Sequence, residues 1–325
     1  MQIVISIPVH EEKEVVVDQI QNYKKYMKNP VIVIHISESF YRNENGRFDE
    51  IEKIQNVYIN SVHFDVGWGN IAHVHISNYL YVCEKIKKFD YFLMHASNEL
   101  YVRKGVEDYI SRYRAGFQRR ILFSNKSMWW PCEMAHKDDV LKKIMEKCNA
   151  KNIVASQVEG SFYSREIFEK IADATQGIDF SQGESYTREE LVFSTIAYSF
   201  LEEKDIGYPI TYSEVHRYDR GLWKIQRIYH SFSILPVMNT VLAHGRREKV
   251  YEWLVNRYES IGNYKIKKAT VKEIVKGNRG YILRKNVMED YPGKFQLYDG
   301  NIYAVKRVER KMTNSVRMYI RGLEA

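Results

Sequence analysis

The chain has 325 residues, of which 45% are hydrophobic and 28% charged, and its formal net charge is +8. This size and composition are typical of a soluble globular protein with a substantial core, built as one large or two modest domains. No window holds the roughly 18 consecutive apolar residues of a membrane-spanning helix, so we expect none. The three cysteines have no Cys-x-x-Cys spacing, which argues against a disulfide framework or a zinc site and favours a cytoplasmic location.

The amino-terminal part predicts alternating strands and helices. Residues 2–9 form an apolar run with no basic segment before it, so they predict a buried strand rather than a secretion signal. Residues 15–26 have helical periodicity, residues 30–36 predict a second buried strand with a polar loop after it, and residues 57–59 a third. This order predicts an α/β domain with a mostly parallel central sheet flanked by helices.

Residues at the carboxyl ends of these strands are the first site candidates. Ligands of open α/β sheets bind beyond the carboxyl ends of parallel strands. We therefore expect Val9, His10 and Ser37 to line a crevice. Residues 89–94 predict a further strand, and the polar loop at residues 95–105 that follows it is a second candidate.

The middle of the chain predicts helices at residues 71–87, 106–113 and 167–174, with an irregular stretch over residues 117–140. Thr187 and Glu190 have the spacing of a capping box, which predicts that a helix begins there and continues to residue 200. The adjacent carboxylates Glu189 and Glu190 have two interpretations. Acidic residues in a first helical turn are favoured by the helix dipole, and a carboxylate fixed there also has the position that a general base requires.

The carboxy-terminal third is strongly basic. From Arg217 to the end, 23 Lys and Arg stand against 10 Asp and Glu, a net +13, whereas the rest has 26 against 31, a net −5. This part also predicts helices near residues 234–243 and 249–257, and a strand with a basic tail at residues 301–310. The charge predicts an anionic partner: nucleotide phosphates, nucleic acid or an anionic membrane surface. We predict residues 1–215 as a core and residues 216–325 as a basic extension, in one continuous domain.

Several catalytic classes lack their motifs here. The chain has no phosphate-binding loop of the Gly-x-x-x-x-Gly-Lys-Ser/Thr type, no Gly-x-Gly-x-x-Gly, no Gly-x-Ser-x-Gly and no His-Glu-x-x-His. It also has no Asp-x-Asp, the motif that many nucleotide-sugar enzymes use to hold a divalent cation. We therefore expect neither a metal nor another cofactor.

Five short motifs, taken in order, resemble the core-2/I-branching β-1,6-N-acetylglucosaminyltransferase family, which includes peptide O-xylosyltransferases. These motifs are Asp65-Val-Gly-Trp-Gly69, Phe89-Asp-Tyr-Phe-Leu-Met-His-Ala-Ser97, Arg165-Glu166, Glu189-Glu-Leu-Val-Phe-Ser-Thr195 and Tyr303-Ala-Val-Lys306. The resemblance implies a GT-A type fold and an inverting sugar transfer from a UDP-sugar without a metal. The chain departs from the family after residue 97, where Ser-Asn-Glu-Leu-Tyr-Val replaces Ser-Gly-x-Asp-x-Pro.

The resemblance also implies roles for residues. The spacing of Glu190 and Thr195 matches the family's catalytic-base motif, which makes Glu190 the base and Glu189 its companion. On the same grounds the diphosphate and nucleoside are expected at Arg284, Lys306, Arg307, Val9, His10, Ser37 and Asp65. The acceptor is expected at Trp68, Ser97, Glu99 and Glu159.

The sequence thus predicts an inverting glycosyltransferase that moves a sugar, with N-acetylglucosamine as the first choice, from a UDP-sugar to a glycan or glycolipid hydroxyl. A cytoplasmic enzyme of this kind can contact the inner face of the plasma membrane through its basic part. Transfer of xylose or another sugar is the alternative within the family. A basic nucleic-acid-binding protein is the alternative from another class, and it has no recognised motif.

Overall fold

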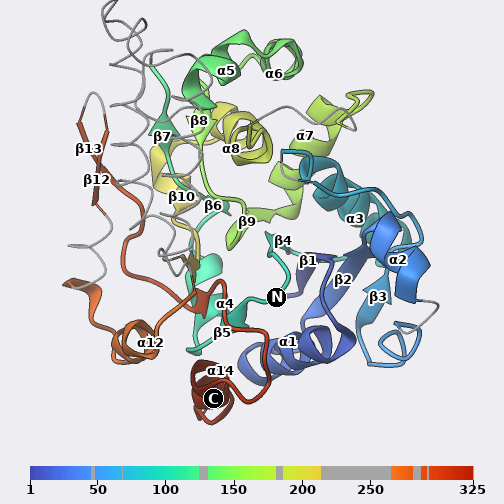
Figure 1. Cartoon of the computed structure of the whole chain (residues 1–325). Coiled ribbons are helices and arrows are strands. Elements are labelled where there is room, and N and C mark those ends of the chain that lie inside the picture. Colours follow the sequence, from blue (N-terminus) through green and yellow to red (C-terminus); the bar gives the residue numbers. More distant parts are fainter. Residues whose placement is uncertain are drawn as a thin grey trace, which may run out of the picture.

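The computed structural model describes residues 1–44, 48–67, 69–123, 131–180, 186–213, 265–280, 287–290 and 293–324. Figure 1 shows a central sheet with helices on both faces. In the described residues this sheet has seven strands in the order β10-β6-β9-β4-β1-β2-β3. The predicted α/β class, with a mostly parallel sheet flanked by helices, is therefore confirmed.

The strands of the central sheet are β1 (Ile3–Val9), β2 (Val31–Ile36), β3 (Val57–Ile59), β4 (Tyr91–Met94), β6 (Ala115–Gly116), β9 (Ser161–Ser164) and β10 (Ile206–Gly207). β1, β2, β3 and β4 are mutually parallel. β9 is antiparallel to both of its neighbours, β4 and β6, and β10 runs parallel to β6. The mixed character of the sheet thus comes from β9 alone among these seven strands.

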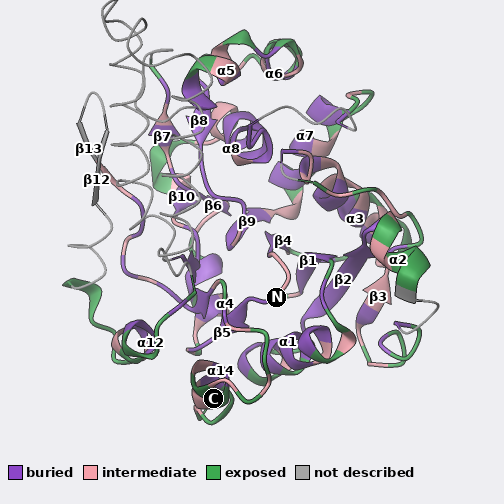
Figure 2. Cartoon of the chain, viewed as in Figure 1, coloured by how far each residue is buried: buried purple, intermediate pink, exposed green. Residues whose placement is uncertain are grey.

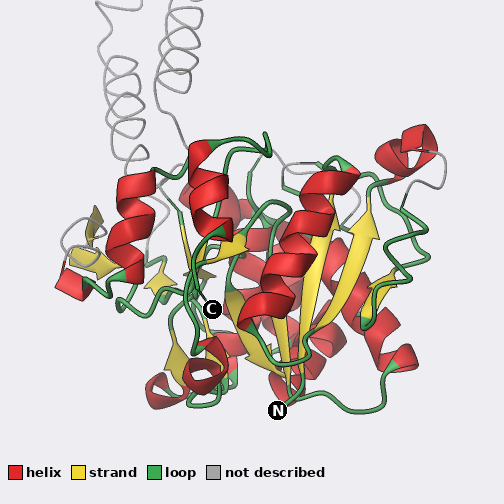
Figure 3. Ribbon diagram, turned by 90° about the horizontal axis from the view of Figure 1, so that it is seen from below, coloured by secondary structure: helices red, strands yellow, loops and turns green. Residues whose placement is uncertain are grey.

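The structure describes ten α-helices, and five of them cover the two faces of this sheet. The ten are α1 (Lys13–Tyr26), α2 (Glu38–Glu44), α3 (Ala72–Lys85), α4 (Val106–Ile110), α5 (Pro131–Lys137), α6 (Asp139–Lys147), α7 (Arg165–Thr175), α8 (Glu189–Ser199), α12 (Lys268–Val275) and α14 (Ser315–Arg321). α1 and α4 lie on one face of the sheet, and α3, α7 and α8 on the other (Figures 1 and 3).

The alternation of side chains along β1 creates two cores. Ile3, Ile5 and Ile7 pack with α1, whereas Val4 packs with α3 on the opposite face, because successive residues of a strand point to opposite sides. Figure 2 shows the resulting buried layers on both faces. Burial on both faces explains why β1 and β2 are almost entirely apolar, with Ser6 and His35 as their buried polar residues.

The described carboxy-terminal residues pack onto the amino-terminal half. β14 (Ala304–Val305) pairs between β11 (Thr211–Tyr212) and β5 (Leu100–Tyr101) in a three-stranded sheet. α14 lies beside α1 (Figure 1), where the Arg321 Nε atom donates to Asp18 at 2.6 Å and the buried Arg317 also pairs with Asp18. These contacts hold the segment around residue 306 close to the end of β4.

Gly160 is required where these two sheets approach each other. Its φ of +74° lies in the left-handed region, and a Cβ atom there would be 2.4 Å from the backbone nitrogen of Thr211. The Gly160 N–H donates to the carbonyl of Met94 at 2.8 Å, and its own carbonyl accepts from Ile210 at 2.9 Å. The turn that carries Glu159 is thereby fixed between β4 and β11.

Several predicted elements were wrong. The polar loop after β2 is the helix α2, and the polar loop over residues 95–105 contains β5. The irregular stretch over residues 117–140 contains β7 (Arg120–Ile121), α5 and the start of α6. The strand predicted at residues 301–310 is confined to β14, while the helices predicted at 234–243 and 249–257 lie outside the described residues.

Short elements complete the described fold, namely β8 (Val154–Ala155), β12 (Val287–Asp290), β13 (Gly293–Gln296) and a 3₁₀ turn at Glu203–Asp205. β8 pairs with β7, and β12 pairs with β13. In the residues placed by the structure, no helix combines the length and the apolar character needed to cross a bilayer.

Candidate functional site

A cavity of about 740 Å³ lies at the carboxyl ends of β1 and β4. Pro8 and His10 contribute to it from the end of β1, and residues 95–98 from the end of β4. The chain runs from β1 outward to β2 and β3 and then returns to β4 on the other side of β1, so this is a topological switch point. Open α/β sheets bind ligands at such points, and the volume suits a small-molecule ligand.

The cavity brings together residues from both ends of the sequence, such as Pro8 and Arg310. Seven of the predicted site residues line it: His10, Ser97, Glu159, Glu189, Glu190, Lys306 and Arg307. The predicted base region and part of the predicted diphosphate region therefore share one cavity.

The other predicted residues lie beside the cavity or outside the described residues. Val9 is buried in the core, and its carbonyl accepts the N–H of the buried Ser37 at 3.2 Å. Asp65 is exposed, although the next two residues line the cavity. Trp68 and Arg284 lie outside the residues that the structure describes.

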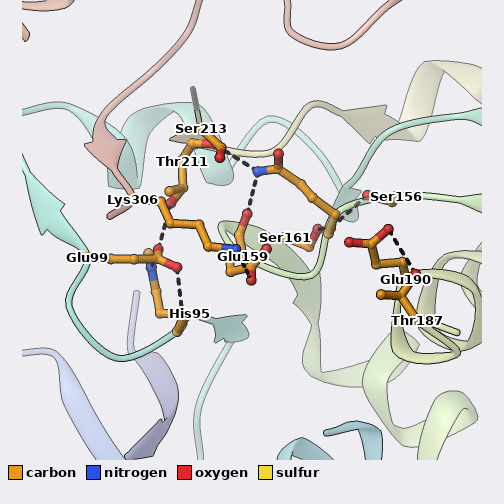
Figure 4. Close-up of polar contacts among 12 residues, drawn as sticks. His95, Glu99, Ser156, Glu159, Ser161, Thr187, Glu190, Thr211, Ser213 and Lys306 are labelled. Carbon is orange, nitrogen blue, oxygen red and sulfur yellow. Dashed lines mark hydrogen bonds and ion pairs between the residues drawn. The ribbon is translucent and has the colours of Figure 1, made fainter. Parts of the chain in front are cut away.

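Glu99 lies fully buried beneath the loop that follows β4. Its Oε1 accepts the N–H of Ala96 at 2.8 Å, and its Oε2 contacts His95 Nδ1 at 2.6 Å and the Thr211 hydroxyl at 3.1 Å (Figure 4). Both carboxylate oxygens are thus used within the protein. Glu99 holds the loop of residues 95–98 in place and does not line the cavity itself.

The amino terminus of α8 is anchored from beneath by Asp138. The Asp138 Oδ2 atom accepts from Arg188 Nε at 2.7 Å and from the hydroxyl of Tyr186, and both ionic side chains are 2% exposed. Asp138 also caps α6 by accepting the N–H of Val140 at 2.9 Å. Breaking a buried ion pair is costly, so the contact between Arg188 and Asp138 holds the first turn of α8 in place. Glu189 and Glu190, which follow Arg188, are positioned by it.

Glu189 is buried at the cavity wall with an unpaired oxygen. The residue is 8% exposed, and its Oε2 has no hydrogen-bond partner among the described residues. Burial raises the pKa of Glu189 to about 7, and the nearby Glu159 adds to this rise. Backbone hydrogen bonds at Glu189 and Gly69 and the charge of Lys306 act in the opposite direction. Glu189 therefore gains and loses its proton much closer to neutral pH than an exposed glutamate does.

Glu190 is less buried than Glu189 and has a different environment. The Thr187 hydroxyl donates to its Oε2 at 3.4 Å, and its backbone carbonyl accepts the N–H of Ser156 at 2.8 Å (Figure 4). α8 begins at Glu189 with no side chain capping its first turn, so the predicted capping box is not formed. The start of the helix was nevertheless predicted correctly.

Lys306 forms an ion pair with Glu159, and both residues line the cavity (Figure 4). Lys306 is 18% exposed and Glu159 is 21% exposed. Burial raises the pKa of Glu159, but the ammonium of Lys306, a backbone hydrogen bond and the charge of Arg307 together outweigh this effect and keep that pKa below its ordinary value. The neighbouring Arg307 has a φ of +61°, which is uncommon for a residue other than glycine.

Sequence reasoning missed further charged residues of the cavity. Arg310 forms a two-point ion pair with Glu11, in which its Nη2 lies 2.6 Å from Glu11 Oε1. Lys265 also lines the cavity and was not predicted either. Glu11 directly follows His10 at the end of β1, and this position could have identified it, whereas Arg310 carried no comparable signal.

His75 forms part of the cavity floor and is neutral. Its Nδ1 lies 2.9 Å from the hydroxyl of Ser6 on β1, and that hydroxyl also accepts from Asn78 at 2.9 Å. Burial lowers the pKa of His75 to about 3. His75 thus contributes an uncharged, hydrogen-bonded part of the cavity lining.

The cavity can bind an anion at one wall and accept a proton at another. Lys306, Arg307 and Arg310 supply positive charge, and Glu189 supplies a carboxylate with a pKa near 7. Across the ranges that the structure covers, no group of three or more His, Cys, Asp or Glu side chains is arranged to hold a metal ion.

Comparison with known proteins gave no assignment. The chain matches no protein-family model and no curated protein.

Proposed function

We propose that the protein is an inverting glycosyltransferase that moves a sugar from a UDP-sugar to a hydroxyl group of a glycan or glycolipid, without a metal. The observation that carries the proposal is one cavity, at the switch point of an α/β sheet, that holds a carboxylate pair and a cation cluster. N-acetylglucosamine is the proposed sugar on the resemblance described above, and a GT-A type fold belongs to the same proposal.

The carboxylate pair supports the first half of the reaction. In a single displacement the acceptor hydroxyl attacks the anomeric carbon and must lose its proton as it does so. A carboxylate with a pKa near the working pH is an efficient acceptor for that proton. Glu189 and Glu190 are adjacent at the start of α8, and Asp138 holds that start in position.

The cation cluster supports the second half. As the bond between the anomeric carbon and the β-phosphate oxygen breaks, its electron pair goes to the departing UDP. Fixed Lys and Arg donors stabilise such developing charge where they are already in position before the reaction. Lys306, Arg307 and Arg310 line the cavity together, and the ion pairs to Glu159 and Glu11 hold two of them in place.

Nucleotide binding in excess chelator tests the proposal. We expect UDP and one UDP-sugar to raise the melting temperature, whereas GDP and CMP have little effect. A ligand at a hundred times its Kd stabilises a protein by roughly 2.7 kcal/mol, which a thermal-shift measurement detects readily. Stabilisation by DNA or RNA, with no response to any nucleotide, would instead favour the nucleic-acid-binding alternative.

A further inference from the structure

The two adjacent carboxylates of α8 have unequal surroundings. Glu189 is 8% exposed, and its Oε2 has no hydrogen-bond partner among the residues that the structure describes. Glu190 is only partly buried, and its Oε2 receives the hydroxyl of Thr187 at 3.4 Å. Adjacent residues of a helix point about 100° apart, so the two side chains meet different parts of the cavity wall, and both line the cavity.

An unpaired carboxylate oxygen in a buried position is unfavourable for folding. Buried polar atoms almost always have a hydrogen-bond partner. A buried carboxylate without one lowers the stability of the folded state more than an unpaired neutral group does. Glu189 lines the cavity, and a ligand that reaches this oxygen, which is closed to solvent, would supply the missing partner. The hydroxyl of an acceptor sugar is a donor of the required kind.

We propose that Glu189, and not Glu190, is the residue that accepts the proton of the acceptor hydroxyl. This inference rests on the proposed glycosyl transfer and reverses the assignment that the family resemblance implies. The hydroxyl O–H bond breaks and its proton goes to Glu189. The hydroxyl oxygen forms a bond to the anomeric carbon, and the bond from that carbon to the β-phosphate oxygen breaks, releasing UDP.

The main chain at Glu190 holds the start of α8 in place, and it does so whichever side chain residue 190 carries. The Glu190 backbone carbonyl accepts the N–H of Ser156, and the Glu190 side chain contacts Thr187. The Ser156 hydroxyl accepts in turn the N–H of Gln118 at 2.9 Å. Glu190 thereby joins the start of α8 to the segment that follows β8.

The charges around Glu189 suit a proton acceptor. Glu159 favours its protonated form, Lys306 favours its ionised form, and the Gly69 backbone hydrogen bond also favours ionisation. The other titratable or charged residues that line the cavity in the described part of the chain are Glu190, the neutral His75, His10, His95, Glu11, Lys265, Arg307 and Arg310. The base must be ionised to act, so the rate of transfer should rise with pH through about 7 and then level.

Matched Glu→Gln variants test the assignment. The assay measures UDP release from the UDP-sugar that binds, as a function of pH, together with the Kd of UDP and the melting temperature. We expect Glu189→Gln to lower kcat by about 100-fold or more and to leave the Kd of UDP within a few-fold. Glu190→Gln should keep at least about a tenth of the rate, and its pH profile should still rise through about 7.

Each outcome decides a separate question. Glu189→Gln with more than half of the wild-type rate, beside an inactive Glu190→Gln, overturns the assignment and leaves the proposed function intact. If both variants are nearly inactive, the pH dependence of the residual rate of Glu190→Gln decides between the two residues. A residual rate that still rises through pH 7 supports Glu189 as the base, and a residual rate that no longer rises there overturns the assignment. A wild-type protein that cleaves no UDP-sugar contradicts the proposed function itself.

Discussion

Lys306→Met is expected to weaken UDP binding and to lower the rate of transfer by about 100-fold or more. Removing one preorganised donor from developing negative charge costs about 10² to 10³ in kcat. Lys306 lies inside the cavity, and methionine keeps most of its apolar stem while removing the charge. The measurements are the Kd of UDP and the rate of UDP release, both in chelator.

Lys276→Met is the matched control, because Lys276 is an exposed lysine that does not line the cavity. It should bind UDP as the wild type does. A Lys306→Met variant that binds UDP within threefold of the wild type, at an unchanged melting temperature, would show that the diphosphate lies elsewhere.

Glu189→Gln is expected to stabilise the protein at alkaline pH and to have much less effect at acidic pH. The folded-state pKa of Glu189, about 7, lies above its ordinary value of 4.5. The folded state therefore binds the proton more tightly than the unfolded state does. The stability from this proton is fully present below pH 4.5 and is lost as the pH rises through 7.

The size of the effect follows from the shift. One pKa unit corresponds to roughly 1.4 kcal/mol, so the free energy of unfolding of Glu189→Gln relative to the wild type should grow by about 2 to 3 kcal/mol between about pH 5 and 8. Denaturant unfolding at several pH values measures this difference. The contributions of groups that titrate alike in both proteins cancel in it. Glu190→Gln is the control and should change much less. A difference that stays constant with pH would contradict the burial argument for Glu189.

The strands β1, β2 and β3 and the helices α1, α3 and α7 were predicted from the sequence to within a few residues. Their apolar residues follow the strand and helix periods, and this signal is local. β5 was missed because Leu100 and Tyr101 form a strand by pairing with β14, about 200 residues later. The polar residues before β5 suggested an exposed loop, but His95 and Glu99 satisfy each other and are buried.

The cavity residues that were predicted came either from short motifs or from their positions at the carboxyl ends of strands, as His10 and Ser97 did. Glu189, Glu190 and Lys306 were identified from short motifs, and the pairing of β14 with β5 and β11 explains why they share a cavity. The unequal burial of Glu189 and Glu190 could not be predicted, because it depends on how Asp138 and Arg188 orient the start of α8. The contact of Arg310 with Glu11 spans 299 positions, and no local sequence pattern predicts it.

The central claim is that this cavity cleaves a nucleotide sugar by direct displacement without a metal. The most direct test incubates the protein with individual UDP-sugars in excess chelator, with hydroxyl acceptors and water present, and follows UDP and the sugar anomer by NMR. We predict that one UDP-sugar is consumed, that UDP is released and that the transferred sugar has the inverted anomeric configuration. Failure to consume any UDP-sugar, or consumption only after manganese is added, would contradict the account.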